Sequence, residues 1–332
     1  MSHTDRTPAD EQPADQGSTD EQPADEGSDR KTRVTVLVAL AANLVIAAAK
    51  MIGGLFASSP ALLSEAAHSV ADSCNEVFLL FALRRSKRPA DRQHPFGYGK
   101  ERFFWALLAA VGIFVTGGCF SVFQGVEALR GGNTQESTTG YVVGLIVLAF
   151  ALIAEGSSLL RALLQVRGQP GKGIGRDPAL RTVIAEDGTA VLGVLLAMGG
   201  VGLHMATGQI VWEASASLAI GALLVYVAYR LGKDAREQLI GEAADPELRE
   251  RIEELLNAQP EIDVVSSLLT MRLGTESTLV AARIDLVPGL ESEKLELVSM
   301  RIRAAIVKAW PEADQVYLDV TDAAKAAADG TP

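Results

Sequence analysis

Residues 61–83 read ALLSEAAHSVADSCNEVFLLFAL, an apolar run that carries four ionisable side chains. The run is long enough to span a bilayer, because a hydrocarbon core of about 30 Å takes about 20 helical residues. Glu65, His68, Asp72 and Glu76 are spaced three, four and four residues apart, so a helix projects all of them from one face. Charged groups at membrane depth are costly and usually mark a binding site or an ion pathway. The run therefore predicts a membrane helix with a role beyond packing.

Five further apolar segments accompany this run, and the basic residues lie in every second connection between them. The connections on the opposite side contain almost no Lys or Arg, so the positive-inside rule predicts that both termini are cytoplasmic. A composition rich in Ala, Gly and Val is typical of a bacterial chain, which favours the plasma (inner) membrane. The six predicted spans are Val34–Phe56, Ala61–Leu83, Phe103–Leu129, Tyr141–Leu164, Ala179–Ala206 and Val211–Leu231.

The net charge of −11 contrasts with a hydrophobic content of 48%, because the acidic residues are concentrated at the two ends of the chain. Residues 1–30 hold nine acids and two bases, without aromatic or β-branched apolar residues, and predict a disordered acidic tail. This stretch lacks the apolar segment of a signal peptide. The cysteines Cys74 and Cys119 lie in apolar runs and are interpreted as buried free thiols, with metal ligation by Cys74 as the alternative.

After Gly241 the composition becomes that of a soluble domain. Helical and strand-like patterns follow in the order helix–strand–strand–helix–strand, which predicts a small two-layer α+β domain of ferredoxin-like type. The domains expected are a six-helix transmembrane domain at 31–240, this cytoplasmic domain at 241–321 and a tail at 322–332. The elements predicted for the soluble domain are residues 245–258, Asp263–Arg272, Thr278–Val287, Glu291–Ala309 and Gln315–Val320.

His68 and Asp72 form an H-x-x-x-D pair one helical turn apart, which can bind one cation from a single helix. The fifth predicted span opens with Glu186 and Asp187, which point about 100° apart on a helix, so one of them is expected to face the site. One imidazole and several carboxylates suit zinc, and they also suit manganese, ferrous iron or cobalt. The alternative for the second span is a polar stripe packed against a partner helix.

Other polar residues lie inside the predicted spans. Glu65, Asn43 in the first span and Glu155 in the fourth are candidates for a proton site or an ion pathway. Asn43 has the alternative of an interhelical hydrogen bond. Lys50 is interpreted as a snorkelling side chain near the outer end of the first span.

Two motifs in register resemble the cation diffusion facilitator family, which contains the zinc transporters. Residues 64–75, SEAAHSVADSCN, resemble the family's second-helix signature, and residues 94–102, HPFGYGKER, resemble its next-loop signature. The resemblance extends over about residues 33–320. It implies proton-coupled export of a divalent metal from the cytoplasm by alternating access, as a homodimer. The metal is then the transported cation, and the resemblance implies no permanently bound cofactor.

The resemblance also assigns residues to the transport site. His68 and Asp72 match the family's ligands on the second helix. On the fifth helix the family usually has an H/D-x-x-x-D pair; here Glu186 falls at the first position and Ala190 at the second, so one ligand is missing. Asp187 is the alternative ligand. The Glu-Asp pair resembles a branch of the family that includes a mitochondrial zinc transporter of animals.

Asp91 and His94 match a second metal position that some family members have in the loop between the second and third helices. Tyr98 stands where those members have another His, and a structured turn is the alternative interpretation. The chain has no His or Cys from residue 205 onward, so a metal-sensing site in the soluble domain is not expected. That domain is expected to serve dimerisation.

Two other classes of protein compete with a transporter. The first is a non-transporting membrane scaffold or regulatory protein with the same fold. The missing second ligand on the fifth helix favours this class. The second is an intramembrane metal-dependent hydrolase, but its H-E-x-x-H motif is absent, so no enzymatic activity is expected. The basic residues form short clusters beside apolar runs, so nucleic-acid binding is not indicated either.

Overall fold

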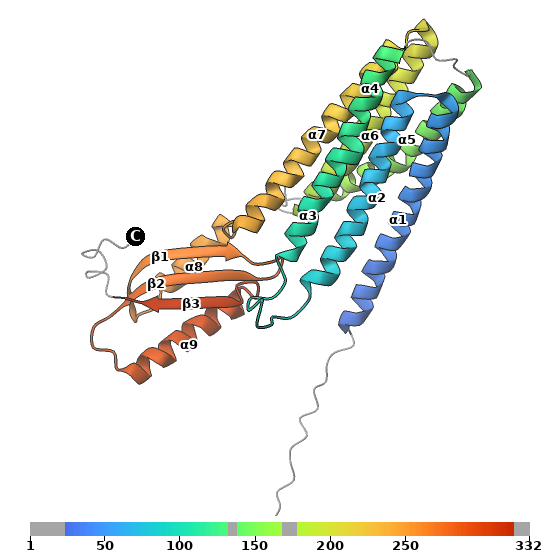
Figure 1. Ribbon diagram of the computed structural model, residues 1–332. Helices are drawn as coiled ribbons and strands as arrows, with labels where there is room; N and C mark the ends of the chain where they lie inside the picture. The colour runs from blue at the N-terminus through green and yellow to red at the C-terminus, as the bar shows by residue number, and fades with distance from the viewer. Residues whose placement is uncertain (1–23, 132–137, 168–177, 322–332) are drawn as a thin grey trace, which may run out of the picture.

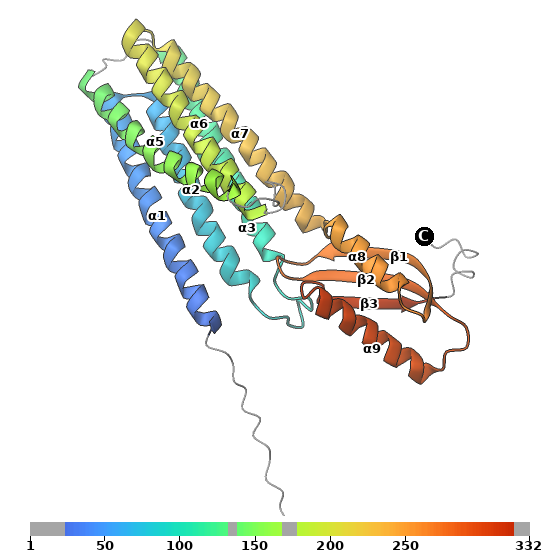
Figure 2. The ribbon, with the colours of Figure 1, turned by 180° about the vertical axis from the view of Figure 1, so that it is seen from behind.

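The structure is a computed structural model that describes residues 24–131, 138–167 and 178–321. It is mostly helical, with a bundle of long helices followed by a small C-terminal sheet domain (Figures 1 and 2). Of the tail predicted at residues 1–30, residues 1–23 lie outside the described residues, and so does the whole tail predicted at residues 322–332. The first helix begins at Ala24, inside the stretch predicted as a tail.

The bundle contains the long helices expected from the apolar segments. One of them is a continuous rod of three parts, in which a π-helical stretch, η1, joins two α-helices. The elements are α1 (Ala24–Ala57), α2 (Pro60–Ser86), the rod α3 (Glu101–Gly112), η1 (Ile113–Cys119) and α4 (Phe120–Gly131), α5 (Thr138–Arg167), α6 (Pro178–Thr207) and α7 (Val211–Ile240).

Five stretches in the described residues are long and apolar enough to cross a membrane. The helix α2 has 27 residues and therefore sufficient length, but its polar and ionisable side chains lower its hydropathy. Composition thus supports a membrane span for five of the six predicted segments. The five stretches are Leu40–Ala57, Glu101–Gly131, Thr139–Gln165, Ile184–Thr207 and Val211–Ile240.

The helix α2 lies at the centre of the bundle and packs against α1, α3, η1, α4, α6 and α7. Its start is set by Ser59, whose side chain accepts a hydrogen bond from the Leu62 amide at 3.3 Å, followed by Pro60 in the first turn. Small buried residues such as Ala66 and Ala71 allow the neighbouring helices to approach closely. The polar face of α2 is therefore surrounded by protein and does not have to face lipid.

The sheet domain follows α7, which ends at Ile240 and is capped by Gly241 in the left-handed region (φ 119°). Its three strands have the order β1–β2–β3, with β1 and β2 antiparallel and β2 and β3 parallel. The helices α8 and α9 contact each other and share a core with alternate residues of β2, so they cover one face of the sheet. The predicted element order is confirmed, with α8 (Pro246–Asn257), β1 (Ile262–Arg272), β2 (Thr278–Leu286), α9 (Ser292–Ala309) and β3 (Gln315–Val320).

The sheet domain docks on the connection between α2 and α3, at the end of the bundle opposite the start of α2 (Figure 1). A Cβ at Gly99 would lie 2.5 Å from the carbonyl oxygen of Leu273, so only glycine permits this approach. The rings of Phe96 and Tyr317 meet edge to face at 6.4 Å. These contacts identify one end of the bundle as the end that carries the soluble domain.

The two cysteines are free thiols, as expected. The prediction that both are buried is wrong, because Cys119 is exposed and Cys74 is half-buried. An apolar run in a membrane bundle does not require burial in protein, since lipid is an equally apolar neighbour.

Candidate functional site

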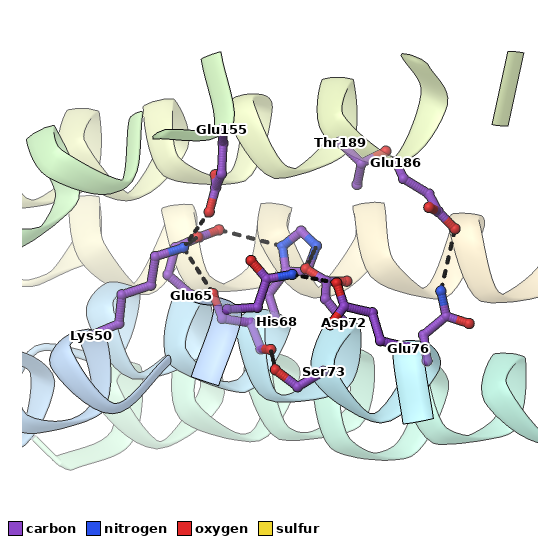
Figure 3. A network of polar contacts seen from close by, with 12 residues as sticks. Lys50, Glu65, His68, Asp72, Ser73, Glu76, Glu155, Glu186 and Thr189 are labelled. Carbon is purple, nitrogen blue, oxygen red and sulfur yellow. Dashed lines mark hydrogen bonds and ion pairs between the residues drawn. The ribbon is translucent and has the colours of Figure 1, made fainter. Parts of the chain in front are cut away.

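The ionisable residues of α2 point to one side, as their spacing predicted (Figure 3). The exposure of their side chains rises from Glu65 to Asp72 along the helix. The side chain of Glu65 is 0% exposed, that of His68 is 5% and that of Asp72 is 40%. Asp72 lies closer than Glu65 to the end of α2 that leads to the soluble domain. The exposure of this face of α2 therefore increases toward that end of the bundle.

The imidazole of His68 lies between two carboxylates. Its Nε2 is 3.3 Å from Asp72 Oδ2, and its Nδ1 is 3.6 Å from Glu65 Oε1. Gly193 of α6 lies against this group, because a Cβ there would overlap the Glu65 carboxylate and come within 3.3 Å of His68 Nδ1. One ring thus presents a nitrogen to each of two acidic groups, and the glycine makes room for the arrangement.

A cavity of about 130 Å³ opens beside this face. It brings Asp72 together with Glu186 and Asp187 of α6, which are the residues predicted to share a site with it. Within the described residues no three His, Cys, Asp or Glu side chains are already arranged to hold a metal ion. The cavity therefore gathers the donors without a preformed coordination shell. Its lining consists of Asn43, Ile46, Ser69, Asp72, Asn75, Glu76, Glu155, Glu186, Asp187 and Ala190.

Glu186 and Asp187 both line the cavity but differ in their partners. Glu186 is exposed, and its Oε1 accepts a hydrogen bond from the Asn75 amide at 3.3 Å. Asp187 Oδ2 is buried and has no hydrogen-bond donor among the described residues. Ala190, one turn further along α6, lines the same cavity with a methyl group. Asp187 thus offers a buried acceptor to the cavity, whereas the carboxylate of Glu186 is exposed.

Asn43 makes the interhelical hydrogen bond that was considered for it, donating to Glu76 Oε1 at 2.6 Å. This bond ties α1 to α2 at the cavity wall. The other oxygen of Glu76 is a buried acceptor without a hydrogen-bond donor in the part of the chain that the structure describes.

Lys50 does not snorkel, and the prediction that it does is wrong. Its side chain is 1% exposed, and its Nζ donates to Glu65 Oε2 at 2.9 Å, Ser69 Oγ at 2.9 Å and Glu155 Oε1 at 3.0 Å (Figure 3). The ammonium finds its acceptors inside the bundle and has no need to reach the interface. Sequence reasoning missed Lys50 as a member of this network. The signal was present, since charges inside a membrane usually pair with one another.

The loop residues Asp91 and His94 lie together but form a turn. Asp91 Oδ1 accepts hydrogen bonds from the amides of Gln93 at 2.9 Å and His94 at 2.7 Å, and Oδ2 accepts one from the Tyr98 hydroxyl at 2.7 Å. These bonds, that of Tyr98 first, lower the pKa of Asp91 to about 2. The His94 ring packs on Tyr98 at 4.2 Å. Both carboxylate oxygens are engaged, so the geometry is that of the structured turn.

A second buried polar cluster closes the opposite end of the bundle. Glu213 of α7 is 0% exposed and accepts hydrogen bonds from the Ser59 hydroxyl and from His204 Nδ1, the latter at 2.5 Å. The Tyr141 hydroxyl lies 3.5 Å from the same ring nitrogen. The cluster joins the start of α2 to α5, α6 and α7, away from the cavity.

The chain is similar in sequence to proteins of known families. A family model described as the cation efflux transmembrane domain matches residues 36–240. The chain is 30% identical over 259 residues to the proton-coupled zinc antiporter SLC30A9, mitochondrial, of Mus musculus, covering 75% of this chain and 45% of that protein. It is 32% identical over 267 residues to metal tolerance protein C4 of Arabidopsis thaliana, covering 78% of this chain and 58% of that protein.

A bacterial relative aligns over most of its own length. The cation-efflux pump FieF of Cronobacter sakazakii is 26% identical over 291 residues, covering 86% of this chain and 92% of that protein. By contrast, this chain spans about half the length of the zinc antiporters that it matches.

Proposed function

The chain belongs to the cation efflux family, and from this premise we propose that it is a multi-pass membrane transporter that exports divalent metal cations from the cytoplasm in exchange for protons. Zinc is the proposed cargo, with iron, manganese and cobalt as alternatives. The cavity carries the proposal, because it gathers Asp72, Glu186 and Asp187 beside the His68–Asp72 pair. Relatives named as a zinc antiporter and a cation-efflux pump support the same class of function.

In this proposal the cargo binds to His68 Nε2, to Asp72 and to a carboxylate of α6. Asp187 is the preferred α6 ligand, because its Oδ2 is buried without a hydrogen-bond donor among the described residues, whereas Glu186 is exposed. One nitrogen with carboxylate oxygens is a donor set that zinc accepts in tetrahedral geometry. Since a methyl group stands at position 190, a water molecule would complete the shell.

Proton coupling follows from the chemistry of these ligands. A metal ion needs a neutral imidazole and ionised carboxylates, so binding releases protons and protonation releases the metal. Protons and metal therefore compete for the same lone pairs on His68 and Asp72. A proton gradient across the membrane can drive metal in the opposite direction.

Alternating access is supported by the difference between the two ends of the bundle. The cavity face is exposed toward the end that carries the soluble domain, where the side chain of Asp72 is 40% exposed. The other end is closed by the cluster of Ser59, His204 and Glu213. We take this as the state open to the cytoplasm, with both termini cytoplasmic and the chain in the plasma (inner) membrane.

Two finer features of the fold belong to the proposal. The helix α2 is the sixth membrane span, since its neighbours in the bundle surround its charges. The soluble domain is ferredoxin-like and pairs with a second copy. Its sheet leaves Leu269 and Tyr317 67% and 53% exposed, which supports an interface at the uncovered face.

The test is zinc flux in vesicles that contain the purified chain and an internal zinc dye. His68→Ala and Asp72→Ala are expected to abolish flux, whereas Asp263→Ala, at an exposed carboxylate of the soluble domain, should transport like the wild type. Wild-type flux in either site variant would refute the proposed site. A wild-type chain without flux of any divalent metal would favour the non-transporting scaffold instead.

A further inference from the structure

The ammonium of Lys50 is surrounded by oxygen acceptors, as a bound cation is in a cation-binding site. It comes from α1, and its three acceptors come from two other helices: Glu65 and Ser69 from α2 and Glu155 from α5. An ammonium has three N–H donors, and all three are used at 2.9–3.0 Å. Two carboxylates and a hydroxyl thus surround one positive charge in a place that is 1% exposed.

This filled position lies at the deep end of the cavity. Ser69 and Glu155 line the cavity, and their oxygens are also the ones that accept from Lys50. Exposure falls from Asp72 to Glu65 in the same direction, from 40% to 0%. Lys50 lies at one end of the row of polar side chains, with Glu76 and Glu186 toward the other end (Figure 3). The ammonium therefore lies on the side of the cavity where exposure is lowest.

His68 connects this position to the proposed cargo site. Its Nε2 faces Asp72 and its Nδ1 faces Glu65, so the two positions lie on opposite nitrogens of one ring. Glu65 Oε1 and Glu155 Oε2 are buried acceptors that have no hydrogen-bond donor among the described residues. Each carboxylate beside Lys50 therefore has a second oxygen that the ammonium does not use.

We propose that Glu65, Ser69 and Glu155 form a second divalent-cation position, which the Lys50 ammonium fills in this conformation and leaves when cargo moves outward. The inference rests on the proposed function, since it continues the route from the cargo site. The charges support the exchange: an ammonium leaves two ionised carboxylates with one excess negative charge, whereas a dication neutralises both. The Lys50 ammonium thus competes with a metal ion for this position and blocks the route while no metal moves.

The stoichiometry of Zn²⁺ binding tests the proposal, measured by calorimetry on the purified full chain in detergent. Lys50→Met removes the competitor, and we expect it to bind one more Zn²⁺ per chain than the wild type. Lys50→Arg keeps the charge and should bind the wild-type number. Adding Glu65→Gln and Glu155→Gln to Lys50→Met should remove the extra ion. An unchanged stoichiometry in folded Lys50→Met would overturn the proposal.

The wild-type chain supplies a second measurement that does not depend on the folding of a variant. Reductive methylation with formaldehyde, read by mass spectrometry, reports whether Lys50 is accessible. We expect Zn²⁺ to increase methylation of Lys50 several-fold, while Lys233, whose side chain is 52% exposed, stays constant. Unchanged labelling of Lys50 under conditions of zinc flux would overturn the inference.

The two measurements separate this inference from the proposed function. If the proposed function fails, the wild-type chain binds no Zn²⁺ that His68→Ala removes. If only the inference fails, the wild type retains His68-dependent binding and Lys50→Met binds the same number of ions.

Discussion

Removal of the Glu213 carboxylate should destabilise the closed end of the bundle. In Glu213→Ala the hydroxyl of Ser59 and the Nδ1 of His204 lose their common acceptor in a region where Glu213 is 0% exposed and His204 3% exposed. Loss of the acceptor of the buried Ser59 hydroxyl costs about 1–3 kcal/mol, whereas His204 Nδ1 still has the Tyr141 hydroxyl at 3.5 Å. Glu213→Gln keeps one acceptor oxygen and should cost about half as much.

The free energy of unfolding in mixed micelles, titrated with a denaturing detergent, measures this loss. Glu127→Ala, at an exposed carboxylate of α4, is the matched control and should change stability by less than about 0.5 kcal/mol. A Glu213→Ala chain as stable as this control would show that the cluster does not hold α2, α6 and α7 together. The inference that this end is closed would then lose its support.

Three further predictions concern the loop, the cavity and the helix contact. The pKa of Asp91 is lowered to about 2, so its carboxylate stabilises the turn fully at pH values above the ordinary carboxyl pKa near 4. This stabilisation is lost as the pH falls through about 2. Tyr98→Phe should raise this pKa, and proton exchange of the loop amides measures it. Ala190→Asp places a carboxylate on the cavity wall and should tighten Zn²⁺ binding about tenfold, or about 1.4 kcal/mol, by calorimetry; equal affinity would contradict the cavity as the cargo site. Gly193→Ala should cost about 1–3 kcal/mol and slow zinc flux, because its methyl group overlaps the Glu65 carboxylate; unchanged flux would argue against a tight contact of α6 with α2.

The sequence predicted the fold where its periodicity was strong. The apolar runs and the soluble pattern after Gly241 indicated the long helices and the order of the C-terminal elements, which the structure confirms. The spacing of Glu65, His68 and Asp72 predicted one polar face, because side chains three and four residues apart share a face of any α-helix. Such local geometry needs no knowledge of the partner helices.

Contacts between helices were much harder to predict. Lys50 was interpreted as a snorkelling residue, yet it pairs with Glu65 and Glu155, which are 15 and 105 residues away in the sequence. The cluster of His204 and Glu213 was not predicted for the same reason, since its members come from different helices. Spacing within one helix cannot show which residue of another helix faces it, and only the complementary charges hinted at the pairing.

Zinc flux under opposed pH gradients tests the transport mechanism most directly. Vesicles that contain the chain and an internal dye are given the same external zinc concentration with the interior either more acidic or more alkaline than the exterior. We predict that zinc accumulates inside when the interior is acidic, that reversing the gradient abolishes accumulation, and that His68→Ala shows neither response. Zinc accumulation that is equal under both gradients, or that persists in His68→Ala, would contradict exchange of metal and protons at this site.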